Sequence, residues 1–369
     1  MTRAAEQILA YCVCALASGV MFFLWRRLDV EDRRRMWRYY GVYSGLMLCG
    51  SCFGTVSWSA QMMNFAYQFQ GNQALSTGDR AQYFSFFSNA IRWRSAFVVM
   101  YPCEFMCLSA AKLLVLDRMA EFAVHRGDSI RKRMVLGGRI VMSVVVLGNA
   151  LGLFTNIASV VQYLKAAEHA GMASVYYSAN NSAFNPDGLK YRALFREEFE
   201  LALKVVSVQS FCEAAVLLLI VAAFVVVGFL CARRLRHMLS TVDSGSAAAS
   251  TGRTLQRQML ATTGFVFAAF LLRSAYSTMF ALAWGLQDVG NVCGTSDDVC
   301  DPTCYNVYRL MNRWMFYTPE FQLTVMLISS PLALLVALWG MTAKATLRVM
   351  QAKWREIMTA PTQLSLVSQ

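Results

Sequence analysis

Seven long apolar stretches, separated by short segments that carry arginine and lysine, constrain the fold of this chain most. Crossing about 30 Å of hydrocarbon takes roughly 20 apolar residues in a helix, because each residue rises about 1.5 Å. Such stretches cover residues 8–25, 39–66, 95–117, 135–161, 205–231, 258–286 and 313–341. The pattern predicts an all-α polytopic membrane protein, with a bundle of seven transmembrane helices within residues 1–341.

The composition agrees with a membrane protein. Hydrophobic residues make up 57% of the 369 residues and charged residues 15%, whereas soluble domains contain about 25% charged residues. So few charges cannot cover a water-facing surface, so we expect much of the surface to face lipid. The net charge of +12 lies in clusters between the apolar stretches. This placement indicates a lipid bilayer as the partner and excludes nucleic acid.

The positions of the basic residues predict the orientation. Cytoplasmic segments of membrane proteins are enriched in lysine and arginine. Arginine clusters follow the first, third and fifth stretches, and the tail at 342–369 is also basic. We therefore predict an N-terminus outside, a C-terminus inside and a location in the plasma membrane. Apolar residues at helical spacing in the tail, such as Leu347, Met350 and Trp354, predict an amphipathic helix on the inner membrane surface.

Two segments of the predicted outer side suggest modification. Asn180 begins an Asn-Asn-Ser sequon, which predicts N-glycosylation. Cys293, Cys300 and Cys304 lie in an acidic loop without histidine, so a disulfide is favoured over a metal site. We expect neither a metal nor a cofactor. The cysteine left over would stay free or pair with Cys12, Cys14 or Cys103.

Smaller features describe individual helices. Gly148 and Gly152 form a spacing that allows close helix packing. Residues 187–204 read as a polar helical extension of the fifth span, with Asp187 as its cap, and residues 244–250 read as a flexible linker.

Charged residues inside the apolar stretches are the main functional candidates. Burying such a group in a membrane costs a few kcal/mol, so it usually has a function. Glu104, Glu213, Arg273 and Glu320 come from four spans and lie in the outer half of the predicted bundle. Three interpretations stay open: an ion-pair network in which Arg273 bridges to Glu213 or Glu320, a ligand pocket selecting a cationic group, and a cation or proton path. Tyr101, Tyr276 and Trp284 could line the same cavity, although packing is the commoner role.

A second charged group, formed by Lys112, Asp117 and Arg118, lies at the inner end of the third span. An ordinary helix end with a snorkelling arginine would explain it. The segment Asp117-Arg118-Met119 also resembles the acidic-Arg-aromatic motif of rhodopsin-like G-protein-coupled receptors, with Met119 in place of tyrosine. Seven spans and the amphipathic tail helix resemble that superfamily as well. The resemblance implies a heterotrimeric G protein as partner, with Asp117 and Arg118 as coupling residues.

We therefore expect a receptor-like protein that transmits an extracellular ligand signal to a cytoplasmic partner. The alternative is an ion channel or transporter that uses the intramembrane acids. We do not expect an enzyme, because the three histidines fall outside the spans and no catalytic motif occurs.

Overall fold

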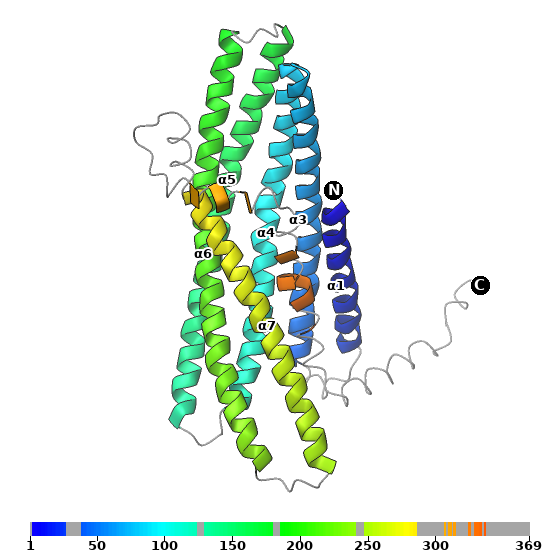
Figure 1. Ribbon diagram of the computed structural model, residues 1–369, viewed down its shortest axis with the longest axis vertical. Helices are drawn as coiled ribbons and strands as arrows, with labels where there is room; N and C mark the ends of the chain where they lie inside the picture. The colour runs from blue at the N-terminus through cyan, green and yellow to red at the C-terminus, as the bar shows by residue number, and fades with distance from the viewer. Residues whose placement is uncertain are drawn as a thin grey trace, which may run out of the picture.

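The computed structural model describes residues 2–26, 38–123, 129–179, 185–240 and 247–285, and further residues within 306–336 (306–307, 309–311, 313–314, 324–325, 328–333 and 336). These residues form long helices that run alternately up and down an elongated bundle (Figure 1). The elements are α1 (Thr2–Arg26), α3 (Arg38–Ser76), α4 (Arg80–Ala123), α5 (Ser129–Ala179), α6 (Pro186–Ser240), α7 (Ala247–Gly285) and the π-helical turn η2 (Ile328–Leu332).

Among the described residues, four helical segments are long and apolar enough to cross a membrane. They are Ala5–Arg26, Arg80–Glu121, Leu136–Ala179 and Pro186–Cys231. A shorter apolar segment, Phe267–Leu282, lies in α7. The chain is therefore an integral membrane protein with a helical bundle. The number of seven spans and the orientation stay predictions, since most of residues 313–341 lie outside the described part.

The helices pack in the order in which they occur along the chain. Each of α1, α3, α4, α5, α6 and α7 contacts the next, and η2 contacts both α7 and α1. In addition, α4 contacts α6, so α4 touches three long helices. Side chains of α4, α6 and α7 therefore meet inside the bundle, where the functional candidates lie.

Glycines permit several of these helix contacts. A Cβ atom on Gly148 of α5 would lie 2.7 Å from the Val216 side chain of α6, and one on Gly54 of α3 would lie 2.5 Å from the Tyr11 ring of α1. Small residues let helix backbones approach closely in a membrane. The close packing predicted for Gly148 is thus confirmed.

The helices extend beyond the predicted spans. α5 and α6 have 51 and 55 residues, which at about 1.5 Å per residue makes each roughly 80 Å long. Two helical hairpins, α3–α4 and α5–α6, therefore rise together at one end of the bundle, which we call the hairpin end (Figure 1). The expected outer loops, which would have begun after residues 66 and 161, are instead helical up to Ser76 and Ala179.

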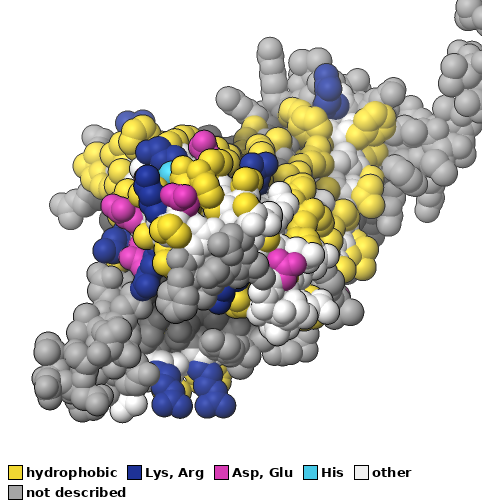
Figure 2. Space-filling view, turned by 90° about the horizontal axis from the view of Figure 1, so that it is seen from above, with side chains coloured by type: hydrophobic (Ala, Val, Ile, Leu, Met, Phe, Trp, Pro, Cys, Tyr) yellow, Lys and Arg dark blue, Asp and Glu magenta, His cyan; other side chains and the backbone are white. Residues whose placement is uncertain are grey.

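Aromatic packing explains why these polar segments stay helical. The rings of Phe84 and Tyr177 stack at 5.5 Å, and Phe195 of α6 meets Phe84 edge-on at 6.3 Å. Seen from the hairpin end, charged side chains of both signs lie among hydrophobic ones on the surface (Figure 2). Exposed charges on this part of α5 and α6 include Lys165, Glu168, Lys190, Arg192, Arg196 and Glu197.

The ends of α6 and α7 differ in detail from the sequence prediction. The helical extension over 187–204 is confirmed, but its cap is Asn185, whose Oδ1 atom accepts a hydrogen bond of 3.2 Å from the Gly188 amide. Pro186 fills the first helical position, where a missing N–H is harmless. α7 begins at Ala247, so residues 247–250 of the expected linker are helical. Alanine, the best helix former, accounts for this start.

Candidate functional site

An ion pair between α6 and α7 is the centre of a buried polar cluster. The Nη2 atom of Arg273 lies 2.9 Å from Oε1 of Glu213, and its Nε atom donates a hydrogen bond of 3.0 Å to the same oxygen. Both side chains are buried. The sequence left open whether Arg273 pairs with Glu213 or Glu320, and in the described residues it pairs with Glu213. Burying two charges costs several kcal/mol per ion, which close attraction and further hydrogen bonds must offset.

Those further hydrogen bonds come from three helices. The Tyr101 hydroxyl of α4 donates to both Glu213 oxygens, at 2.9 and 3.0 Å, and accepts a hydrogen bond from Arg273. The Arg273 guanidinium also lies 5.4 Å from the centre of the Tyr101 ring, a cation–π distance. Gln209 donates to Glu213 at 3.1 Å and Ser277 at 3.0 Å. The polar cluster thus comprises Tyr101, Gln209, Glu213, Arg273 and Ser277.

The sequence analysis missed Gln209 and Ser277. Both lie four residues from a charged partner, Gln209 before Glu213 and Ser277 after Arg273. Residues four apart share one face of a helix. A polar residue at this spacing from a charge inside an apolar stretch was the signal that could have identified them.

Glu104 forms a second buried site, on the same helix as Tyr101. Its Oε1 atom accepts a hydrogen bond from the Tyr11 hydroxyl of α1, another contributor that the sequence analysis missed. Its Oε2 atom is buried and has no hydrogen-bond partner among the described residues. Arg273 and Lys112 lie near enough to act on the charge of Glu104. The acid therefore keeps an acceptor without a partner among the described residues, in the combined field of these two cations and the Glu213 carboxylate.

Lys112 is a buried charge that contacts another helix. The sequence analysis grouped it with Asp117 and Arg118 at the inner helix end, but Lys112 is buried and Asp117 is exposed. The Lys112 ammonium sits 4.1 Å from the centre of the Phe270 ring of α7. The aromatic face attracts the cation and offsets part of its desolvation. Lys112 thus belongs with the buried charges of α4 and α7.

A proline in α4 explains a polar contact with α5. Pro102 has no N–H, so it cannot donate to the carbonyl of Val98 one turn earlier. The Asn156 side chain donates a hydrogen bond of 2.9 Å to that carbonyl. An unpaired carbonyl inside a membrane would cost several kcal/mol. Asn156 therefore satisfies the group that Pro102 leaves free, next to Tyr101.

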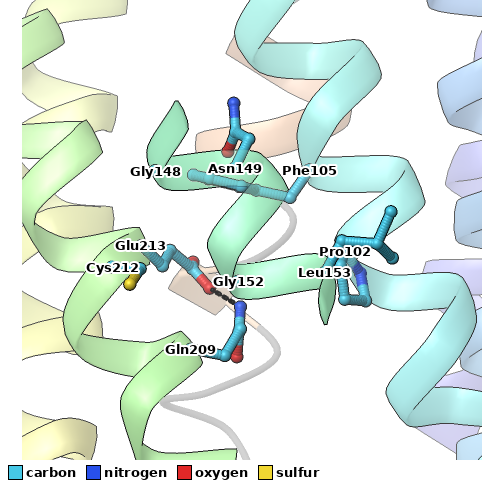
Figure 3. Close-up of a pocket in the computed structure, with 9 residues that line it drawn as sticks. All are labelled: Pro102, Phe105, Gly148, Asn149, Gly152, Leu153, Gln209, Cys212 and Glu213. Carbon is cyan, nitrogen blue, oxygen red and sulfur yellow. Dashed lines mark hydrogen bonds between the residues drawn. The ribbon is translucent and has the colours of Figure 1, made fainter. Parts of the chain in front are cut away.

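A small crevice lies beside the polar cluster, between α4, α5 and α6 (Figure 3). Its volume is about 10 Å³, room for about one water molecule, and the Glu213 and Gln209 side chains form part of its wall. The lining residues are Pro102, Phe105, Gly148, Asn149, Gly152, Leu153, Gln209, Cys212 and Glu213.

Comparison with known proteins finds no match: no family model, curated protein or solved structure is similar to this chain. The site must therefore be interpreted from its own chemistry.

Several predicted residues lie outside the described part of the chain. They are Glu320, Asn180, the loop cysteines Cys293, Cys300 and Cys304, the side chain of Arg118 and the tail helix. The eight cysteines in the described residues are free thiols, including Cys12, Cys14 and Cys103, which were considered as disulfide partners. The glycosylation, disulfide and coupling predictions stay predictions.

The arrangement has two chemical capacities. The Arg273–Glu213 pair, with Tyr101, joins α4, α6 and α7 through charge-assisted hydrogen bonds, so breaking it would remove polar contacts among these three helices. Glu104 offers a buried acceptor that could hold a proton or a small cation.

Proposed function

We propose that this protein is a receptor-like membrane protein that transmits a signal from an extracellular ligand to a cytoplasmic partner. The observation that supports it is the Arg273–Glu213–Tyr101 contact, which ties α4, α6 and α7 together in the middle of the bundle. A signalling protein needs an element with two arrangements, whose equilibrium both sites can bias. A buried ion pair between helices provides one, because it is either closed or open.

Apolar packing between the polar cluster and the C-terminal end of α4 would transmit a helix movement toward Asp117 and Arg118. A single apolar cluster joins α4, α6 and α7 there, including Leu116, Phe224 and Phe270. At its edge, the Cys231 thiol of α6 donates a hydrogen bond of 3.1 Å to the Met119 carbonyl of α4. Movement of α6 or α7 relative to α4 would therefore alter the surface around Arg118.

The ligand chemistry follows from the charges that are already paired. Glu213 is neutralised by Arg273, so it does not select a cation. One carboxylate oxygen of Glu104 has no hydrogen-bond partner among the described residues, and Glu320 is the remaining acid of the predicted set. A cationic ligand would therefore be recognised by Glu104 and Glu320 rather than by Glu213.

The test is nucleotide exchange on heterotrimeric G proteins, measured with the purified chain in vesicles. We expect exchange above that of empty vesicles, its loss in Arg118→Ala, and its retention in Arg139→Ala, an exposed arginine of α5. Glu213→Gln, which removes the charge from the ion pair, should raise exchange in the absence of ligand. Unchanged exchange in Arg118→Ala, or none in either wild type or Glu213→Gln, would refute the proposal.

A second candidate function is a cation or proton path. Buried side-chain oxygens without a hydrogen-bond partner among the described residues occur on α3, α4, α7 and η2, and buried polar atoms in a membrane need partners. A passing proton or cation, with its water, would supply them. These atoms belong to Ser57, Glu104, Ser109, Ser274 and Ser329.

Flux measurements separate this candidate from the receptor. Proteoliposomes with an internal pH-sensitive dye should show a flux that Glu104→Gln or Glu320→Gln reduces and Glu168→Gln, an exposed control at the hairpin end, does not. Equal flux in empty vesicles would exclude the path.

A further inference from the structure

Four cysteines lie on the neighbouring helices α3 and α4, within the predicted second and third spans. They are free thiols that reach the surface at least in part: Cys49 and Cys52 on α3, and Cys103 and Cys107 on α4. Within residues 41–64 of α3, the exposed side chains form one stripe at helical spacing, and they are those of Val42, Cys49, Cys52 and Val56. A stripe that is exposed and apolar, inside an apolar stretch of a membrane protein, contacts hydrocarbon.

Cys49 lies close to Cys107 where the two helices touch. A Cβ atom on Gly50, the neighbour of Cys49, would lie 3.2 Å from the Cβ atom of Cys107, so the α3 backbone passes directly beside that residue. The Cys49 thiol acts electrostatically on Cys107 more strongly than Cys103 does, although Cys103 is only one turn away on the same helix. Of these two thiols, Cys49 is therefore the nearer to Cys107.

The depth of both thiols restricts their chemistry. Counted at about 1.5 Å per residue from the predicted inner ends of their apolar stretches, at residues 39 and 117, Cys49 and Cys107 each lie about 15 Å into hydrocarbon. Hydrocarbon disfavours a thiolate, which is the form of cysteine that attacks electrophiles and binds metals. A neutral thiol can still give up its hydrogen atom, because that step creates no charge. A hydrogen-atom acceptor that forms at this depth is the peroxyl radical of an oxidised unsaturated acyl chain.

We propose that Cys49 and Cys107 are a redox-sensitive pair that reduces lipid peroxyl radicals and thereby forms a disulfide between α3 and α4. Each thiol gives one hydrogen atom to one peroxyl radical, which becomes a lipid hydroperoxide. The two sulfur radicals left behind pair their electrons in the S–S bond, so two thiols and two peroxyl radicals yield one disulfide and two hydroperoxides. The disulfide would fix α3 against α4 within one turn of Glu104, which lies three residues before Cys107. The pair stands independently of the receptor function, because it depends only on the two thiols and their lipid-facing position.

Cross-linking of the full chain in liposomes of polyunsaturated phosphatidylcholine tests the pair. A lipid-soluble azo initiator under air generates peroxyl radicals inside the bilayer, and unreduced peptides are then mapped by mass spectrometry, with fragment ions to locate each disulfide. We expect the peptide that joins Cys49 to Cys107 to increase severalfold with the initiator. α-Tocopherol, which intercepts peroxyl radicals, should return it to the level without initiator, and hydrogen peroxide added to the water should not produce it.

Matched variants show whether this pair reacts. Cys49→Ala should abolish the cross-link to Cys107, because the nearer thiol is gone. Cys52→Ala removes another exposed thiol of the same stripe and should leave the Cys49–Cys107 peptide unchanged. The proposal would be overturned by radical treatment that leaves both thiols unlinked, by a disulfide between other cysteines in place of this one, or by equal cross-linking with aqueous peroxide. Should Cys49→Ala fail to fold, the α-tocopherol experiment on the wild type still decides.

Discussion

Replacing Glu213 by leucine should destabilise the protein strongly, because it removes the carboxylate that forms an ion pair with the buried Arg273. Arg273 would lose both of its contacts with Glu213, and Gln209 and Ser277 would lose their acceptor. Breaking a buried pair from one side costs about 3–5 kcal/mol. At about 2 °C per kcal/mol for a large chain, the apparent melting temperature should fall by roughly 6–10 °C.

The double variant Glu213→Leu/Arg273→Met is the informative control. Replacing a buried ion pair by apolar groups of similar volume is often neutral or even stabilising. We therefore expect the double variant to melt within about 3 °C of the wild type, far above Glu213→Leu alone. Melting in detergent can be followed by circular dichroism, because the described residues are almost all helical.

Two results would refute this reasoning. If Glu213→Leu melted within about 2 °C of the wild type, Arg273 would not depend on Glu213 for its burial. If the double variant were less stable than Glu213→Leu, the loss would come from packing and hydrogen bonding rather than from an unpaired charge. The difference in melting temperature between the two variants therefore measures the cost of leaving the Arg273 charge without Glu213.

The remaining predictions concern the scaffold. Asn156→Leu should lower the melting temperature by a few degrees, since a buried carbonyl without a partner costs about 1–3 kcal/mol, and adding Pro102→Ala should restore it by supplying an N–H. Gly148→Ala should destabilise by about 1–3 kcal/mol through overpacking against α6, with partial rescue by Val216→Ala. Gly78→Ala should destabilise by about 1 kcal/mol, because Gly78 has a φ of 79°. Thermal melting with each rescue partner checks the first two, and melting of the single variant checks the third; a rescue that lowers stability further would contradict the mechanism.

The sequence identified the charged centre of the site but not its surroundings. Glu104, Glu213 and Arg273 are visible because a charge inside an apolar stretch is rare and costly. Gln209 and Ser277 are uncharged. Gln209 shares a face of α6 with Glu213, and only the alignment of α6 with α7 brings Ser277 to the same carboxylate. Asn156 illustrates the same limit. Pro102 in the sequence indicates that a backbone carbonyl of its helix lacks an N–H donor, but the register of α5 against α4 determines which side chain reaches that carbonyl.

Hydropathy located the apolar segments better than the helix ends. It measures transfer into hydrocarbon, so it fades where a helix leaves the membrane and continues in water. Residues 67–76 and 162–179 are too polar to count as spans, yet they remain helical because aromatic side chains such as Phe84, Tyr177 and Phe195 pack between the hairpins. The contact of Lys112 with the Phe270 ring could not be predicted either, because the ring comes from another helix.

The length of α6 turns small movements at the ion pair into large ones at the tip. Glu213 lies near the middle of α6, a continuous helix of 55 residues that begins at Pro186 at the hairpin end. With an arm of about 40 Å, a tilt of about 5° at the level of Glu213 would displace the start of α6 by roughly 3–4 Å. In such a tilt, α6 would pivot at the level of its contact with Arg273. A fluorophore pair on the two hairpin tips would therefore report the state of a contact buried deep among the helices.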